Sequence, residues 1–447
     1  MKSIRLLTIG LFLFTMSVTF SVLAQERLLS LEDAVSLAVE KNRDLQVSRM
    51  EINKTAQKIR EAKGYALPTI AASGQYLHYL QRQVTFLPGN FAGLDDSQIA
   101  TLRVGGTDAY VGGVSLVQPI FQGEIFSGIR AARLAEKLST EDLALTQSVV
   151  VTDVKKAYLN VLISNEQLKL QKQSIARNEQ ALKDARSLLA QGRASRIDTL
   201  RAYITIENLR PDIIRLTNGI EIAKTVLKTT IGIPESEQIE LTDSLRYDGV
   251  VPFLANATIL EEALASRPEV ARLVITEKLN AEQINIERAE YLPKFSAIGL
   301  IQTQTQANDY RFGDYKWPVS SYVGLQFAVP IFSGFRTAAR VQQAKVTKLQ
   351  TEKGLENVRE LIRAEVKIAL SKVEESKRRI ESQVQTVSTA ELSYRITRDR
   401  WKQGIASRLD MADAELSLSQ AKSNYLQAVY DYLTASVDLD KALGRAN

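Results

Sequence analysis

The chain has 447 residues, of which 45% are apolar and 24% are charged, and it contains one histidine and no cysteine. This composition is that of a folded protein, and the lack of cysteine excludes disulfides, thiol catalysis, thiolate metal sites and lipid attached to cysteine. The formal net charge of +6 is mild for this length and gives no case for nucleic-acid binding.

The first predicted element is a cleavable export signal at residues 1–24. Lys2 and Arg5 precede a short apolar run, and small residues lead to Ala24, a pattern that favours a signal peptide over a buried N-terminal helix. Its removal leaves 55 basic and 51 acidic residues. No later stretch has eighteen consecutive apolar residues, so any membrane insertion must use strands.

Short motifs recur in order along the chain, which predicts a tandem duplication of residues 25–233 and 258–447, joined by a connecting segment at 234–257. The clearest motif is QGRASRIDTL at 191–200, which returns as QGIASRLDMA at 403–412, displaced by 212 residues. The other repeated motifs are Tyr65-Ala66-Leu67-Pro68 with Tyr291-Leu292-Pro293, Pro119-Ile120-Phe121-Gln122-Gly123 with Pro330-Ile331-Phe332-Ser333-Gly334, and Ile231-Gly232 with Leu443-Gly444.

Each half is expected to hold a helix, a β-hairpin, a long helix, a turn and a shorter helix. In the first half these are expected at 30–64, about 68–119, about 124–190, 191–197 and 198–231. In the second half they are expected at 258–290, about 293–330, about 335–402, 403–409 and 410–443. Pro68 and Pro119 are 51 residues apart but Pro293 and Pro330 only 37, so the first hairpin has the longer surface loop.

The long helices are predicted from their freedom from proline and their good helix formers. Apolar residues recur every seven positions, which favours left-handed coiling over an ordinary amphipathic helix. They are Val154, Val161, Leu168, Ile175, Leu182 and Leu189, then Val366, Val373, Ile380, Val387, Tyr394 and Trp401. Pro211 is expected to kink or locally end its helix.

The hairpin strands show a two-residue alternation. Ile70, Ala72, Gly74 and Tyr76 alternate with smaller or polar residues, as do Val323, Leu325, Phe327 and Val329, although Ile298 and Leu300 blur the pattern in a third strand. The alternation fits strands between lipid and water, or a soluble hairpin. Because four strands cannot close a barrel, membrane strands would require several copies, and three copies would give twelve strands and a channel.

The motif order, its spacing and its duplication resemble the outer-membrane efflux protein family, the TolC-like channels. The resemblance runs from Leu31-Glu32-Asp33-Ala34 to Leu443-Gly444. It implies a mainly α-helical fold with a β-barrel contribution: long coiled hairpins form a periplasmic tunnel, and four strands per protomer share a twelve-stranded trimeric barrel. It also implies a homotrimer in outer-membrane lipid, fed by a periplasmic adaptor and an inner-membrane pump.

By this resemblance, the two turns are the periplasmic tips that dock the adaptor. The tip residues are Gly192, Ala194, Asp198 and Leu200, then Gly404, Ala406, Asp410 and Met411. A second interpretation is local: the glycines make left-handed turns, and Ser195 and Ser407 cap the helices that follow. The two roles do not exclude each other.

Asp410 and Asp413 lie about one turn apart on one helix face. The resemblance makes them the gate at the tunnel mouth, six carboxylates in a trimer, whereas the alternative is a pair of solvated acids. The family's gate-linking arginine is replaced here by Ala406, so Arg193 or Arg408 is a substitute candidate, and Trp401 matches an aromatic tip position.

An enzyme is disfavoured because His78 is the only histidine and no phosphate loop, nucleophile elbow or metal-ligand spacing surrounds it. No cofactor and no metal are expected. The predicted function is a passive outer-membrane exit duct for small molecules such as drugs or toxic solutes. The alternatives are type I polypeptide secretion, metal-ion efflux and, less favoured, a soluble periplasmic coiled-coil adaptor.

Overall fold

The fold is mainly helical in the computed structural model, which describes residues 27–93, 95, 97–247, 249 and 257–445. The expected export signal lies outside these residues. The chain divides into two compact units. The hairpin unit comprises the described parts of residues 1–42, 153–248 and 378–434, and the sheet unit comprises those of 43–152, 249–377 and 435–447.

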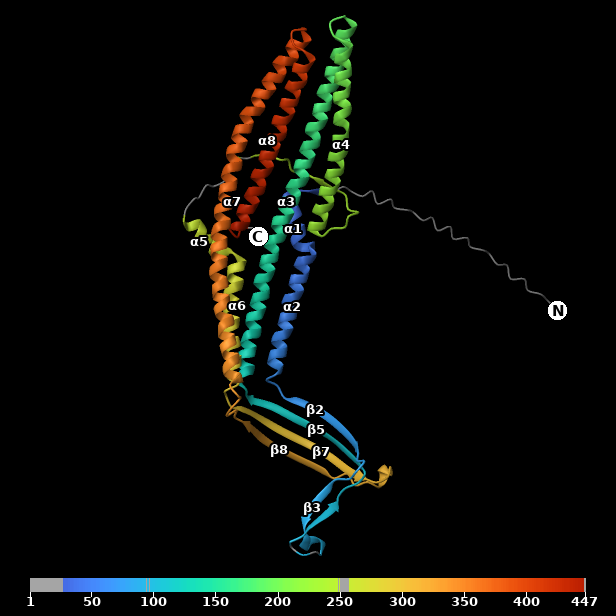
Figure 1. The fold of residues 1–447 in the computed structure, drawn as a ribbon, viewed down its shortest axis with the longest axis vertical. Coiled ribbons are helices and arrows are strands. Elements are labelled where there is room, and N and C mark those ends of the chain that lie inside the picture. Colours follow the sequence, from blue (N-terminus) through green and yellow to red (C-terminus); the bar gives the residue numbers. More distant parts are fainter. Residues whose placement is uncertain (1–26, 94, 96, 248, 250–256, 446–447) are drawn as a thin grey trace, which may run out of the picture. The chain divides into compact units, whose positions relative to one another are not determined.

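The elements follow the expected order (Figure 1). Up to residue 241 they are β1 (Arg27–Leu29), α1 (Leu31–Lys41), α2 (Arg43–Gly64), β2 (Thr69–His78), β3 (Val84–Pro88), η1 (Gly89–Ala92), β4 (Ile99–Arg103), β5 (Asp108–Phe121), α3 (Gly123–Ala190), α4 (Arg196–Ile231) and β6 (Ile239–Leu241). From residue 257 they are α5 (Ala257–Ser266), α6 (Pro268–Ala289), β7 (Lys294–Ala307), η2 (Phe312–Asp314), β8 (Val319–Ala328), α7 (Arg336–Lys402) and α8 (Arg408–Ala442). Among the described helices, none has a stretch long and apolar enough to cross a membrane.

The opening helix of each half is broken, which the sequence did not predict. Asn42 leaves the helical conformation between α1 and α2, and its side-chain amide donates to the carbonyl oxygen of Thr230 at 2.8 Å. Arg267 makes the corresponding break before Pro268, where the helical conformation is disfavoured. Its guanidinium donates to the carbonyl oxygens of Lys441 and Ala442 at 3.2 and 3.3 Å. At each break, a side chain therefore donates hydrogen bonds to carbonyl groups at the end of a later helix, α4 or α8.

The two repeated glycines pack against these breaks. Gly232 has a φ of 92°, and a Cβ there would lie 2.5 Å from the carbonyl oxygen of Lys41. Gly444 has a φ of 71°, and a Cβ there would lie 2.9 Å from the Cβ of Ser266. Both positions need a left-handed backbone and the absence of a side chain, which only glycine supplies readily.

The long helices keep their apolar seams away from solvent. In α3, Val154, Val161 and Leu182 are buried, and in α7 Ile380 and Trp401 are buried, while the remaining seam residues are buried or half-buried. α4 runs without interruption through Pro211, contrary to the possibility that proline would end it. Pro211 is exposed, so water can satisfy the carbonyl group that lacks its helical partner.

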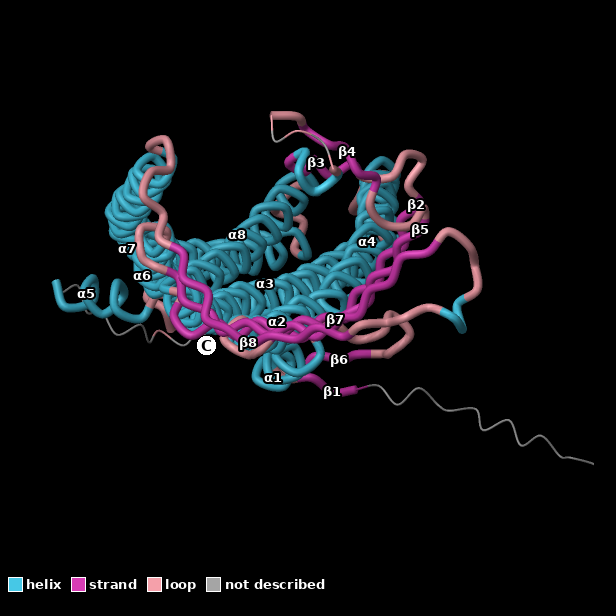
Figure 2. Tube along the Cα trace, turned by 90° about the horizontal axis from the view of Figure 1, so that it is seen from below, coloured by secondary structure: helices cyan, strands magenta, loops and turns pink. Residues whose placement is uncertain are grey.

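One antiparallel sheet carries the four predicted strands in the order β2-β5-β7-β8 (Figure 2). Because residues paired across strands share a face, the register defines two faces. The apolar face includes Ile70, Leu116, Val114, Ile301, Val323 and Leu325, and the polar face includes Ser73, Gln75, Ser115, Gln302, Gln304 and Gln326. Ile298 and Leu300 are apolar residues on the polar face, as their position in the sequence indicates.

Aromatic rings gather at the loop end of the main sheet, where β2 ends and β5 begins. Tyr76 and Tyr110 are stacked with ring centroids 5.0 Å apart, and Trp317 lies 6.3 Å from Tyr110. The longer first loop contains a separate antiparallel sheet of β3 and β4, which the sequence did not predict. Phe91, in the turn between these strands, is 78% exposed.

Candidate functional site

The first turn, which lies between the end of α3 and the start of α4, closes this helical hairpin. Gly192 adopts a φ of 72°, and the N–H of Arg193 donates to the carbonyl oxygen of Leu188 at 2.8 Å, which satisfies the end of α3. Ser195 then caps α4: its hydroxyl oxygen accepts from the N–H of Ile197, and its own N–H donates to Asp198 at 3.0 Å. The local sequence therefore suffices to form this turn.

The second turn closes the α7–α8 hairpin in the same way. Gly404 has a φ of 79°, and the N–H of Ile405 donates to the carbonyl oxygen of Arg400 at 2.9 Å. Both the N–H and the hydroxyl of Ser407 donate to Oδ2 of Asp410 at 2.8 Å. These two hydrogen bonds hold the pKa of the Asp410 carboxyl below its usual range, and the bond from the N–H has the larger effect.

The two turns are in contact. Nη2 of Arg193 donates to the carbonyl oxygen of Gln403 at 3.2 Å, which links the first turn to the second. Next to this link, an apolar cluster joins α3 to the second hairpin; its buried members are Ala181, Ala185, Trp401 and Met411. The turns thus form one surface within the hairpin unit.

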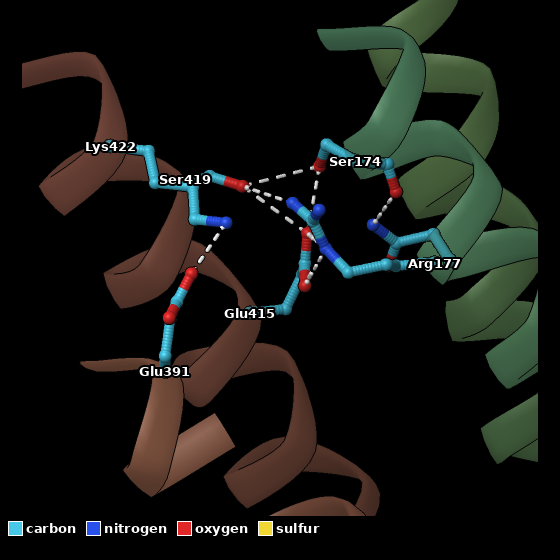
Figure 3. Close-up of polar contacts among 7 residues, drawn as sticks. Ser174, Arg177, Glu391, Glu415, Ser419 and Lys422 are labelled. Atoms are coloured by element: carbon cyan, nitrogen blue, oxygen red, sulfur yellow. Dashed lines mark hydrogen bonds and ion pairs between the residues drawn. The ribbon is translucent and has the colours of Figure 1, made fainter. Parts of the chain in front are cut away.

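A buried polar network ties α3 to α8 farther from the turns (Figure 3). Nε of Arg177 donates to both carboxylate oxygens of Glu415, at 3.0 and 2.8 Å. The hydroxyl groups of Ser174 and Ser419 donate to Oε1 of Glu415 at 2.9 and 3.2 Å. Glu415 is 6% exposed, so its charge depends on these partners. Within the second hairpin, Lys422 pairs with Glu391 at 2.7 Å.

Arg408 is a buried cation near the second turn. It is 5% exposed, and within the part of the chain that the structure describes, its Nε and Nη2 have no hydrogen-bond partner. Burial lowers the pKa of the guanidinium, and the charges of Asp198 and Glu415 act against this shift. The buried carboxylate of Glu415 therefore accepts hydrogen bonds from Arg177, and it acts on Arg408 only through its charge, after that of Asp198.

The expected gate and docking residues differ in exposure. Asp410 and Asp413 are both exposed at the start of α8. Gly192, Gly404 and Leu200 are exposed, and Ala194, Asp198 and Ala406 are half-buried. Met411 is only 3% exposed and packs in a cluster with Trp401, so its side chain does not lie on the exposed surface of the turn.

Sequence analysis missed the Arg177–Glu415 network. Its partners are 238 residues apart, and a glutamate on a polar helix gives no local sign of burial. The available signal was the position of Ser174 and Asn178, which lie four residues apart on a second buried stripe of α3. Across the described residues, no group of three or more His, Asp or Glu side chains is placed to hold a metal ion.

Comparison with known proteins places the chain in a family. The model of the family described as "Outer membrane efflux protein" matches residues 34–233 and again 259–445. The chain is 27% identical over 333 residues to the alkaline protease secretion protein AprF of Pseudomonas aeruginosa, covering 73% of this chain and 68% of that protein. It is 24% identical over 451 residues to the outer membrane protein TolC of Escherichia coli, covering 96% and 84%.

The fold agrees with that assignment. The solved structure of the outer-membrane channel OprN superposes with a TM-score of 0.74 at 17% sequence identity, covering 93% of this chain and 89% of that one. The chain therefore belongs to the outer membrane efflux protein family and serves as an export channel of the outer membrane.

Proposed function

We propose that three copies of the chain form a passive exit duct in a tripartite export system, together with a periplasmic adaptor and an inner-membrane pump. The four strands of each copy contribute to a shared twelve-stranded transmembrane barrel, and the paired helices form a periplasmic tunnel. The observation that carries the proposal is the four-stranded sheet, which has one apolar face, one polar face and two open edges. Repetition of the elements supports an origin by internal duplication.

The proposed cargo is small molecules such as drugs or toxic solutes. The polar face of the sheet offers the amide groups of glutamine and the hydroxyl groups of serine, which hydrogen-bond solutes of either charge without retaining them. Selectivity then resides largely in the pump. The likeness to AprF, an alkaline protease secretion protein, favours polypeptide secretion as the second candidate.

The proposed gate is a ring of Asp410 and Asp413 from three copies. Both side chains are exposed, and the cap at Ser407 keeps Asp410 ionised. Six carboxylates close together repel one another, so a narrow ring would bind divalent cations. Cation binding at this ring would block the duct.

The exposed parts of the two turns are the proposed adaptor-docking surface. It comprises Gly192, Ala194, Asp198, Leu200, Gly404 and Ala406, without the buried Met411. Glycine at each apex leaves the backbone accessible to a partner.

Arg193, Arg408 and Trp401 are the proposed closing links between helices at the mouth. Arg193 already joins the two turns, Trp401 packs between the hairpins, and Arg408 has two buried donor nitrogens without a hydrogen-bond partner among the described residues. Substituting alanine for Arg193 and for Arg408, one at a time, should make the closed duct leak. An unchanged closed-state current in both variants would contradict this assignment.

Single-channel conductance in planar bilayers tests the duct and its gate. Wild type should give a small, cation-selective current that millimolar divalent cations block, and the Asp410→Ala and Asp413→Ala double variant should lose the block. A block of equal strength in the double variant would reject the gate. A protein that stays in solution without detergent and conducts nothing would reject the channel.

The cargo is tested separately in cells that lack the chain. Loss of drug tolerance with normal protein secretion supports small-molecule export. Loss of a secreted polypeptide with normal drug tolerance would replace it with the second candidate.

A further inference from the structure

The two-stranded sheet in the longer loop, here called the loop hairpin (residues 84–103), has an exposed apolar face. Among the described strands, β3 and β4 pair only with each other. Pro88, two residues after Phe86, is paired with Ile99, so all three lie on one face. Phe86 is 68% exposed and Ile99 is 72% exposed. Two strands alone are marginally stable in water, so this uncovered face indicates a missing contact.

The base of the loop hairpin is fastened to the end of β7. The N–H of Gly106 donates to Oε1 of Gln306 at 3.1 Å. The N–H of Thr107 donates to Oδ1 of Asn308 at 3.0 Å. Gly106 also lies so close to β7 that a Cβ there would be 2.3 Å from the carbonyl oxygen of Ala307. The main sheet therefore sets the direction in which the loop hairpin leaves it.

The loop hairpin lies on the concave side of the main sheet. Both belong to the sheet unit. Figure 2 shows the strands of the main sheet as a curved band, with β3 and β4 on its inner side. When curved sheets close into a barrel, the concave side is the side of the barrel axis. In the proposed barrel the loop hairpin therefore reaches over the channel, where no lipid is present to cover its apolar face.

The loop end of the main sheet is the outer mouth of the proposed duct, because the helices of the proposed tunnel join the strands at the other end. Three copies would thus bring three loop hairpins to one mouth. Arg103, at the base, is the only lysine or arginine of the loop hairpin, and its only acids are Asp95 and Asp96. The face that includes Phe86 and Ile99 can therefore be covered beyond its base without burying a charge.

We infer that the loop hairpins of neighbouring copies pack together through the face of Phe86 and Ile99 and form a hydrophobic constriction across the outer mouth. The partner of each hairpin is the same hairpin of another copy, and the turn η1 lies outside the contact. A narrow apolar constriction excludes water and so stops hydrated solutes. The inference rests on the proposed shared barrel and adds an outer gate to it. Because apolar side chains neither titrate nor bind cations, this gate differs from the acidic one.

Access to the barrel interior from outside the cell tests the outer gate. The probe is Gln304→Cys on the polar face of β7, in a chain that has no cysteine of its own. The rate at which a membrane-impermeant maleimide labels it is measured on intact cells. Replacing the loop hairpin by a short glycine-serine linker should raise this rate roughly fivefold or more. Phe86→Asp with Ile99→Asp should raise it as well, because the charges draw water into the constriction.

The matched control is Leu87→Asp with Leu102→Asp, which adds the same charge to the opposite face of the loop hairpin. It should leave the labelling rate unchanged. Equal labelling of wild type and the linker variant, or an equal rise with both aspartate pairs, would overturn the outer gate and leave the channel intact. If Gln304→Cys is not labelled even in the linker variant, although the protein is present in the outer membrane, the water-filled barrel of the proposed function fails as well.

Contact between copies is tested by oxidising Phe86→Cys as a single variant in intact cells. Because each copy then has one cysteine, any disulfide must join two copies. A covalent dimer is expected on a non-reducing gel, with roughly tenfold less from Leu102→Cys, whose sulfur would lie on the far face. No dimer from Phe86→Cys, or a preference for Leu102→Cys, would overturn the inferred contact.

Discussion

Arg177 on α3 and Glu415 on α8 form a buried ion pair in which one guanidinium nitrogen donates to both carboxylate oxygens. The side chains are 20% and 8% exposed, so neither charge has water as a ready substitute. The pair therefore links the α3–α4 hairpin to the α7–α8 hairpin. Each hairpin supplies one of the two partners.

Glu415→Ala should destabilise the hairpin unit by about 3–5 kcal/mol, because it leaves the largely buried Arg177 without its carboxylate and removes one of the two acidic charges that act on Arg408. The matched control is Glu391→Ala, whose pair with Lys422 is more exposed and should contribute less than about 1 kcal/mol. Thermal unfolding in detergent, followed by circular dichroism, measures both. Equal losses in the two variants would contradict a special role for the buried pair.

The proposed gate should respond to pH through Ser407. Because hydrogen bonds lower the folded-state pKa of Asp410, its carboxylate is present above the ordinary value of about 3.9 and is lost only as pH falls through the lowered pKa. Ser407→Ala removes the hydroxyl's contribution to the lowered pKa of Asp410. The block by divalent cations should therefore be lost at a higher pH than in wild type. Conductance measured between pH 3 and 6 gives the midpoint.

Ser195→Ala is the control for that experiment, because it removes the equivalent cap in the first turn without touching a proposed gate acid. Each substitution should cost about 1 kcal/mol of helix stability. A shift of the same size in both variants would assign the pH response to general loosening of the turns.

Gly232→Ala should destabilise the protein by about 1–3 kcal/mol, because the methyl group meets the backbone at Lys41 and the backbone conformation is left-handed. Gly219→Ala lies in the same helix with nothing within 4 Å of the added Cβ, and should instead stabilise α4 by about 1 kcal/mol. Opposite shifts in melting temperature are expected. Destabilisation by both substitutions would show that the close contact at Gly232 is not the cause.

Phe332→Ser should weaken the proposed oligomer, because Phe332 is exposed in one chain and follows β8, an open sheet edge that the proposed shared barrel would cover. Phe91→Ser is the control, since Phe91 is exposed to a similar extent and lies in the loop between β3 and β4, away from the edges of the main sheet. The measurement is the temperature at which the oligomer dissociates in mild detergent, with a drop of roughly 5–10 °C expected for Phe332→Ser alone. Equal behaviour of the two variants would argue against burial of Phe332.

Local rules account for the elements that sequence analysis located well. The long helices α3 and α7 correspond to the expected segments, because uninterrupted helix formers and a seven-residue apolar period act within one element. The turn residues Gly192 and Ser195 carry their own geometry in the same way. The alternation of apolar and polar residues along the strands predicted the two faces of the sheet, because successive side chains of a paired strand lie on opposite faces.

The elements that sequence analysis missed depend on distant partners. Asn42 breaks its helix because its side chain bonds to Thr230, and nothing near Asn42 in the sequence indicates this. Met411 looked like part of an exposed tip, but Trp401 covers it. Glu415 gains its partner from another hairpin. Each is a tertiary effect that overrides a correct local pattern.

The short edge strands also bear on how the protein is made. Each copy has two open sheet edges, β2 and β8, so in the proposed assembly any two copies that meet could pair before the ring is complete. In the proposed assembly this contact is head-to-tail, so an unclosed chain of copies would grow unless rotation brings its ends together. Biogenesis would then be a competition between ring closure and polymerisation, in which a low local concentration favours the closed product.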